Sequence, residues 1–342
     1  MSEPVVLALE TSCDETAAAV VASGTRVVAS VVSSQVDLHA RYGGVVPEIA
    51  GRAHLERLLP VLSETLRAAD VSRDGSGGCA LHLEAVAATT GPGLVGSLLV
   101  GVAAAKSLAM AWGVPFVAVN HLEGHLYAAL LEDPAIEFPV IVLLVSGGHT
   151  LLIDMAGPGH YEVLGQTLDD AAGEAFDKVA RYLGLGYPGG PALEAAARGG
   201  DPTALELPRA MLNEGFAFSF SGLKTAVVRH VERHPETDTA DLAASFQEAV
   251  VDVLVTKALA AASARGARGI CLAGGVAANT HLREALAAAC TERGLHPFVP
   301  TRSMCTDNAA MIAAAGHFRL RRDGASGLDT GADPNLAFPA RA

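Results

Sequence analysis

The sequence is poor in basic residues and in aromatic residues, and it contains no long apolar run. Lys and Arg number 24 against 37 Asp and Glu, which leaves a formal net charge of −13. This balance excludes a protein that holds nucleic acid through its overall field, because neutralising phosphates requires clustered Lys and Arg. Any contact with RNA must therefore be local or shared with a partner.

No apolar run reaches the roughly 20 residues that span a membrane. The beginning MSEPVVLALETS has an acidic residue where a secretory signal is basic. We therefore expect a cytoplasmic protein that makes no contact with a membrane.

The five cysteines form no recognisable set, since they are odd in number, far apart and without a CxxC pair. Neither a disulfide framework nor a structural zinc ribbon is indicated, and we expect reduced thiols. Half of the 342 residues are apolar, which is enough for two lobes of roughly 150 residues, each with a buried core.

Two segments share one pattern, an apolar strand, a small polar turn and a second apolar strand. They are VVLALETSCDETAAAVV, from Val5, and VIVLLVSGGHTLLIDM, from Val140. Each is followed by a Gly-rich turn that opens a helix, TTGPGLVG in the first case and LAGGVAAN in the second. The pattern predicts a duplicated α/β fold, with a first lobe at 1–137, a second at 138–324 and a surface tail at 325–342. The stretch SRDGSGG is predicted to be a loop.

The small polar turns of the two hairpins could bind phosphate through backbone N–H groups, because Ser, Gly and Thr let the backbone approach closely. The candidate loops are Ser12–Glu15 and 144–148. Tight hairpins use the same residues for geometry alone, so both interpretations stay open. The later turn with Gly274, Gly275 and Asn279 could meet an adenine or a ribose, or be an ordinary turn with an Asn cap.

His121 and His125 in NHLEGHLYAAL are four residues apart. On a helix both imidazoles leave one face and can bind a single metal ion. Asp307, in MCTDNAAMIA, could supply a third ligand. The alternative is a pair of capping or core histidines.

Two other enzyme classes use similar residues. A metalloprotease of the HExxH type needs its general base directly after the first histidine, where this chain has Leu122. Glu123 lies about 200° around the helix from the histidines and faces away from a shared metal. A regulatory nucleotide-binding ATPase would use paired phosphate turns in a duplicated α/β fold, with carboxylates around the metal.

Taken together, ten blocks resemble the signature of the tRNA N6-adenosine threonylcarbamoyltransferase family, long mislabelled O-sialoglycoprotein endopeptidase. They run in family order from about residue 5 to residue 316, and Gly51 replaces a residue that is usually Ser in the family. The blocks are ETSCDET, SSQVDLHARYGGVVPEIAGRAH, TTGPGLVGSLLVG, NHLEGH, LLVSGGHT, AGEAFDKVAR, YPGGP, FSFSGLKT, LAGGVAAN and CTDNAAMIA.

The resemblance implies the duplicated α/β fold of actin, Hsp70 and sugar kinases. It also implies one divalent metal per chain, Fe(II) or Zn(II), held by His121, His125 and Asp307. The implied positions for binding threonylcarbamoyl-AMP are Leu144, Val145, Ser146, Gly147, Gly148, Asp177, Gly190 and Asn279. From its residues alone, Asp177 could equally be a helix-surface carboxylate paired with Lys178 or Arg181.

The implied reaction transfers a threonylcarbamoyl group to N6 of adenosine 37 in tRNAs that read codons beginning with A. The N6 amine is a weak nucleophile, so catalysis must come from positioning and from stabilising developing charge. Asp14 and Glu15 are the candidates for orienting or deprotonating this amine, or they are a polar turn without chemistry. The implied partners are tRNA, a shorter inactive paralogue and a small P-loop ATPase.

Overall fold

The computed structural model describes residues 3–70 and 81–339, so the predicted SRDGSGG loop lies outside the described residues. The chain forms two compact units. Unit 1 contains the residues up to Ile136 together with Asp307–Pro339, and unit 2 contains Glu137–Thr306. Each unit is built around its own five-stranded sheet.

The sheet of unit 1 has the order β3-β2-β1-β4-β5. The first three strands are antiparallel neighbours, and β4 and β5 continue the sheet parallel to β1. The strands are β1 (Glu3–Glu10), β2 (Glu15–Ala22), β3 (Arg26–Ser34), β4 (Leu81–Gly91) and β5 (Phe116–Asn120). The helices are α1 (Val36–Ala40), α2 (Pro47–Ala68), α3 (Val95–Trp112), α4 (His121–Leu126), α5 (Ala128–Glu132) and α12 (Ala309–Asp323).

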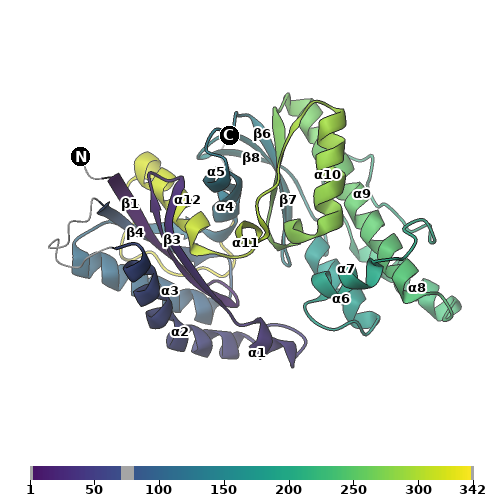
Figure 1. Ribbon diagram of the computed structural model, residues 1–342, viewed down its shortest axis with the longest axis horizontal. Helices are drawn as coiled ribbons and strands as arrows, with labels where there is room; N and C mark the ends of the chain where they lie inside the picture. Colours follow the sequence, from purple (N-terminus) through teal and green to yellow (C-terminus); the bar gives the residue numbers. More distant parts are fainter. Residues whose placement is uncertain (1–2, 71–80, 340–342) are drawn as a thin grey trace. The chain divides into compact units, whose positions relative to one another are not determined.

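Alternation along β1 explains how helices cover both faces of this sheet. Val5, Leu7 and Leu9 point to one face, where they join a core with residues of α2 and α3. Val6 points to the other face, where a Cβ placed on Gly316 of α12 would lie 3.7 Å from its Cγ1. Figure 1 shows α2 and α3 side by side along this sheet and α12, in yellow, against it.

Helix α3 is the one helix in the described part of the chain with the length and hydropathy to cross a membrane. A single such helix is weak evidence, because core helices of soluble proteins pass the same test. Leu98, Val102, Ala105 and Ala109 of this helix are buried against the rest of unit 1.

Unit 2 repeats the plan with the order β10-β9-β6-β7-β8. An antiparallel hairpin is again followed by strands parallel to its first member, so the predicted duplication of an α/β unit is confirmed. The strands are β6 (Val140–Val145), β7 (Thr150–Gly157), β8 (His160–Gln166), β9 (Gly269–Ala273) and β10 (His296–Phe298). The helices are α6 (Ala172–Tyr182), α7 (Gly189–Ala197), α8 (Ser221–Arg233), α9 (Thr239–Arg265), the short 3-10 helix η1 (Gly275–Ala278), α10 (Thr280–Glu292) and α11 (Arg302–Cys305).

The structure assigns the end of the chain differently from the sequence-based division, which placed residues up to 324 in the second lobe. Residues from Asp307 onward pack in unit 1. The reason is that α12 covers a face of the first sheet, where Met311 and Ile312 are fully buried. The histidines and Asp307 therefore belong to one unit.

The segment predicted to be a surface tail is bound along unit 1 over its described part. Ser326 N donates to Phe116 O at 2.8 Å, and Asp333 N donates to Thr90 O at 2.8 Å. Further on, Asn120 Nδ2 donates to Ala337 O at 3.0 Å. The tail thus contacts the ends of β4 and β5.

Candidate functional site

Helix α4 begins directly where β5 ends, and Asn120 joins the two. Its Oδ1 accepts from the backbone N–H groups of Leu122, at 2.9 Å, and Glu123, at 3.2 Å, which makes it the N-cap of the helix. A Cβ on Gly124 would lie 2.6 Å from Cδ1 of Ile312. Glycine therefore lets α4 pack closely against α12, with Asp307 just before that helix.

This arrangement brings the three predicted metal ligands together. Asp307 Oδ1 lies 3.4 Å from Nε2 of His121 and 3.3 Å from Nε2 of His125. Two ligands held at about 2.0–2.1 Å by one tetrahedral ion lie about 3.3–3.4 Å apart. The spacing of these atoms therefore suits a divalent cation.

The surroundings of His125 give a second reason to place a cation here. Its ring is 1 % exposed, and neither nitrogen makes a hydrogen bond. A buried polar group without a partner is unfavourable, and a metal ion is one of the partners that removes the penalty. Two imidazoles and one carboxylate are a donor set that zinc and iron both accept.

The charges at this centre depend on one another. Burial opposes ionisation of Asp307, but attraction to His121 and the nearness of both imidazoles hold its pKa well below the usual range. Burial also opposes a charged His121, yet the carboxylates of Asp307 and Glu10 raise the pKa of this imidazole well above 6.5. Without metal the centre therefore holds a proton that a cation would displace.

The predicted catalytic pair lies at the start of β2. Burial, together with repulsion from Asp307 and Asp14, raises the pKa of the Glu15 carboxyl to about 9. Ser34 Oγ donates to Glu15 Oε1 at 3.1 Å. Burial also raises the pKa of the neighbouring Cys13 thiol, so this cysteine stays protonated and unreactive at neutral pH.

Glu123 is buried on α4 and takes no part in the metal centre. Arg319 Nη1 of α12 donates to its Oε2 at 3.0 Å, and Arg322 lies 3.9 Å from its other oxygen. The carboxylate that a metalloprotease would need as its base is therefore paired on another side of the helix.

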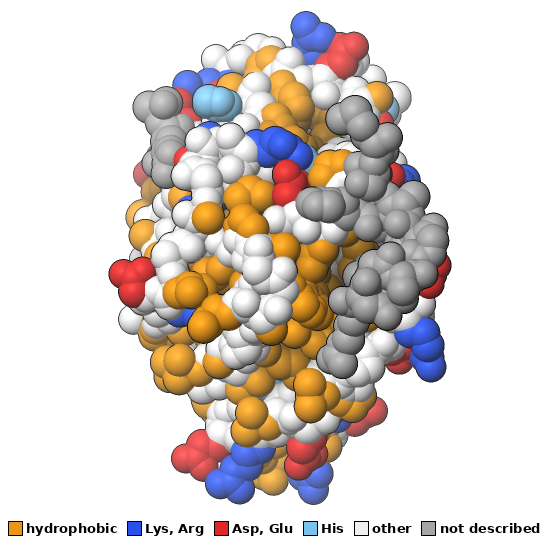
Figure 2. All heavy atoms as spheres, turned by 90° about the vertical axis from the view of Figure 1, so that its left-hand side faces the viewer, with side chains coloured by type: hydrophobic (Ala, Val, Ile, Leu, Met, Phe, Trp, Pro, Cys, Tyr) orange, Lys and Arg blue, Asp and Glu red, His pale blue; other side chains and the backbone are white. Residues whose placement is uncertain are grey.

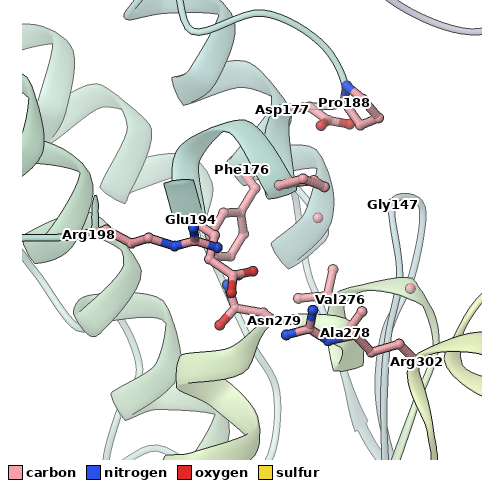
Figure 3. A pocket seen from close by; sticks show the side chains of 14 residues that line it. Gly147, Phe176, Asp177, Pro188, Glu194, Arg198, Val276, Ala278, Asn279 and Arg302 are labelled. Carbon is pink, nitrogen blue, oxygen red and sulfur yellow. The ribbon is translucent and has the colours of Figure 1, made fainter. Parts of the chain in front are cut away.

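A second candidate site is a cavity of about 490 Å³ within unit 2. Of the predicted substrate-binding positions it is lined by Gly147, Asp177, Gly190 and Asn279. Figure 3 shows Phe176, Asp177, Glu194 and Asn279 among the side chains around this space. A volume of this order suits a small molecule, since ligand pockets span roughly 300–1,000 Å³.

The other predicted positions in the 144–148 loop form the strand and the turn next to the cavity. Leu144 and Val145 are fully buried in β6. Ser146 Oγ accepts from His149 N at 3.1 Å and so closes the hairpin turn. Gly148 follows in that turn and does not line the cavity. Of the five predicted positions in 144–148, only Gly147 lines the cavity. Leu144 and Val145 belong to the strand that leads to it.

Asp177 anchors one wall of the cavity. Its Oδ1 accepts from Gly189 N at 2.9 Å, which ties α6 to the beginning of α7. Burial raises the pKa of this carboxyl. Lys178 pairs with Asp170 at 2.6 Å and Glu174 at 2.9 Å.

Asn279 is the predicted cap of a helix and also lines the cavity. Its Oδ1 accepts from Leu282 N at 3.0 Å and caps α10, while its Nδ2 donates to Gln247 Oε1 at 2.8 Å and the residue lines the cavity. Glu194 Oε1 accepts from Thr280 N at 3.1 Å beside it.

Sequence reasoning missed several side chains of this cavity. Phe176, Glu194 and Arg302 come from three helices and Arg198 directly follows α7, and their spacing in the sequence carries no signal of a shared site. Only Phe176 lies in a quoted block, next to Asp177.

Comparison with known proteins finds relatives along nearly the whole chain. The sequence profile of tRNA N6-adenosine threonylcarbamoyltransferases matches residues 26–314. A protein of that name from Symbiobacterium thermophilum is 57% identical over 99% of this chain and 98% of its own length. Its counterpart from Caldicellulosiruptor saccharolyticus is 50% identical over 98% of this chain and 99% of its own length.

Solved structures support the fold. HypF from T. kodakarensis has a TM-score of 0.67 at 16% identity, over 94% of this chain and 49% of its own. An activator of 2-hydroxyisocaproyl-CoA dehydratase from Clostridium difficile has a TM-score of 0.52 at 13% identity, over 94% of this chain and 96% of its own. At such identities the likeness shows the fold alone, and it agrees with the predicted duplicated α/β fold.

Proposed function

Because the chain belongs to the tRNA N6-adenosine threonylcarbamoyltransferase family and is a transferase that acts on tRNA, we propose the following reaction for it. It transfers the threonylcarbamoyl group of threonylcarbamoyl-AMP to N6 of adenosine 37 in tRNAs that read codons beginning with A, and AMP leaves. The observation that carries the assignment to residues is the close cluster of His121, His125 and Asp307, of which His125 is buried.

These three residues hold one divalent metal ion, Fe(II) or Zn(II). Such an ion supplies Lewis acidity, which stabilises negative charge that develops on an oxygen. The chain contributes the ligand atoms, a protonated Nδ1 on His121 beside Glu10, and a buried environment that strengthens electrostatic interactions.

Asp14 and Glu15 orient the attacking amine or accept its proton. The amine lone pair is delocalised into the purine, so the reaction depends on holding the amine in line with the carbonyl. A carboxyl group whose pKa is raised to about 9 is a stronger base once ionised than an ordinary one. Neutralising Asp307 would remove part of the repulsion that keeps the proton on Glu15.

The cavity of unit 2 binds the adenylate through Gly147, Asp177, Gly190 and Asn279. Leu144 and Val145 support this site as the buried strand that ends at the loop, and Ser146 and Gly148 shape the turn around Gly147. Its small residues leave room for a ligand, and its polar groups can select one.

We further propose that the enzyme works in the cytoplasm, away from membranes, in a complex with a shorter inactive paralogue and a small P-loop ATPase. The net charge of −13 favours a complex that adds basic surface for tRNA. Leu55, Leu59 and Leu99 of α2 and α3 are more than half exposed and line an apolar groove on unit 1. Figure 2 shows hydrophobic side chains gathered over a wide part of this side of the unit, a feature typical of protein contact surfaces.

The regulatory ATPase is the second function that we considered, and no residue of the metal centre favours it. It would release ADP in the absence of RNA, whereas the transferase releases AMP and adds mass to tRNA.

The test is nucleoside mass spectrometry on unmodified tRNA incubated with this protein, its partners and threonylcarbamoyl-AMP. The wild type is expected to form N6-threonylcarbamoyladenosine, and a His121→Ala, His125→Ala variant is expected to lose that activity. His234→Ala, at a half-exposed histidine of unit 2, is the matched control and should behave as the wild type. Equal product from the double variant would contradict the role of the metal centre.

A further inference from the structure

We propose that Glu10 is the positioning residue that selects the tautomer of His121, keeping hydrogen on Nδ1 so that Nε2 offers its lone pair to the metal. The inference rests on the metal binding proposed above and extends it to a residue outside the ligand set.

Glu10 is the last residue of β1 and its side chain is completely buried. Its Oε1 accepts from Ser12 N at 2.5 Å, and its Oε2 accepts from Thr89 Oγ1 at 2.5 Å. The same Oε2 lies 3.1 Å from His121 Nδ1. A backbone donor in the turn after β1 and a side-chain donor on β4 therefore hold this carboxylate against one edge of the imidazole.

The chemistry of the pair decides which ring nitrogen carries hydrogen. An ionised carboxylate has only lone pairs, so a hydrogen bond to it requires Nδ1 to be the donor. In a neutral imidazole this leaves Nε2 with its lone pair. Nε2 is the atom that lies 3.4 Å from Asp307 Oδ1, on the side of the other ligands.

The other neighbour of Nδ1 cannot make this selection. Ser12 Oγ lies 3.2 Å from the same nitrogen. A hydroxyl group either donates or accepts, so it tolerates both tautomers. Glu10 is therefore the group whose chemistry distinguishes them.

Replacing Glu10 by Gln keeps the shape of the side chain, but an amide no longer requires hydrogen on Nδ1 of His121. If the amide oxygen faces Ser12 N, the amide NH₂ points at His121 Nδ1, which must then accept and move its hydrogen to Nε2. If the amide is turned, its NH₂ meets the N–H of Ser12, and two donors face each other in a buried space. The first arrangement opposes binding of a metal through Nε2, and the second keeps hydrogen on Nδ1 only by leaving the buried N–H of Ser12 without an acceptor.

The experiment measures zinc affinity of the full chain by competition with a chromophoric chelator, and nitrogen shifts of the zinc-loaded histidines by long-range ¹H–¹⁵N NMR. Glu10→Gln is expected to lower zinc affinity about 10–100-fold, the usual effect of losing an outer-sphere partner of a ligating histidine. The wild type should show a protonated Nδ1 and a zinc-bound Nε2 on His121, and the variant should lose that pattern.

Glu123→Gln is the matched control, since it removes another buried carboxylate at α4 that does not touch His121. It should lower stability and leave the His121 pattern unchanged. Wild-type affinity in Glu10→Gln, or an equal loss of affinity in Glu123→Gln, would overturn the proposal.

Thr89→Val tests the same idea if Glu10→Gln does not fold, because it removes one donor that holds the carboxylate. Thr89→Ser keeps that donor and should restore binding. Full zinc affinity in Thr89→Val would then overturn the proposal. Absence of zinc binding by the wild type itself would instead overturn the metal site proposed above, and this inference with it.

Discussion

Glu123 of α4 and Arg319 of α12 form an ion pair of 3.0 Å in which the carboxylate is completely buried. The pair joins the helix that carries both metal histidines to the helix that follows Asp307. The pair therefore stabilises the packing of α4 against α12, on the side away from the ligands.

Glu123→Ala is expected to lower the free energy of unfolding by about 3 kcal/mol, the low end for breaking a buried pair, because Arg319 is partly exposed. Urea denaturation followed by circular dichroism measures this change. Transferase activity per folded molecule should persist. Complete loss of chemistry with unchanged stability would instead support a base role for Glu123.

Metal binding should stabilise unit 1. Zinc at 100 times its dissociation constant is expected to add about 2.7 kcal/mol to stability, since it binds the folded state. The melting temperature of the wild type should rise with zinc and fall again with a chelator, as measured by differential scanning fluorimetry. The His121→Ala, His125→Ala variant should show no zinc-dependent change, and an equal rise there would place the bound zinc elsewhere.

Asn120 is expected to couple the described C-terminal tail to α4, the helix that carries His121 and His125. Asn120→Ala removes the cap of α4 and should cost about 1 kcal/mol of stability, with weaker zinc binding. Asn120→Asp keeps the accepting oxygen at the start of the helix, loses the donor to Leu336 O and Ala337 O, and adds a negative charge. Zinc titrations of both variants separate the contribution of the cap from that of the tail, and unchanged affinity in both would remove Asn120 from the metal centre.

His54 should contribute a loss of stability as the pH falls below 6.5. Burial holds the pKa of His54 below 6.5, although Cys13 O and the carboxylates of Glu10 and Asp14 favour the charged ring and Arg57 opposes it. Between the lowered folded pKa and 6.5, the unfolded chain binds a proton that the folded chain does not, so acid favours unfolding.

Urea unfolding of the wild type and of His54→Asn, measured between about pH 5.5 and pH 7.5, checks this sign. The variant should show a flatter dependence on pH. An identical slope in both proteins would assign the acid sensitivity to other groups.

Two adjacent glycines give a matched pair at the cavity of unit 2. A Cβ on Gly190 meets nothing within 4 Å, whereas a Cβ on Gly189 would lie 2.5 Å from Cα of Asp177. Gly190→Leu should keep the fold and weaken AMP binding at least about tenfold, or 1.4 kcal/mol, because its side chain occupies the cavity. Gly189→Ala should cost about 1–3 kcal/mol of stability through overcrowding.

Isothermal titration calorimetry with AMP and thermal melting distinguish the two effects. Normal AMP binding by a folded Gly190→Leu variant would contradict the use of this cavity for the adenylate.

The sequence by itself determined the repeated hairpins and the placement of His121 and His125 on one face of a helix. Strand alternation and helical spacing are local properties, readable within a few residues, and ten motif blocks identified the family. It also placed Glu123 away from the metal, since helical geometry alone sets that angle.

Only the tertiary structure decided which distant residues complete the sites. Asp307 belongs to unit 1 because α12 covers the open face of the first sheet, a packing outcome that no local pattern encodes. Glu10 meets His121 across 111 positions of sequence, and Glu194 meets Thr280 across 86. Such contacts depend on how buried strands and helices fit together, because burial leaves a polar side chain only the partners that the packing brings to it.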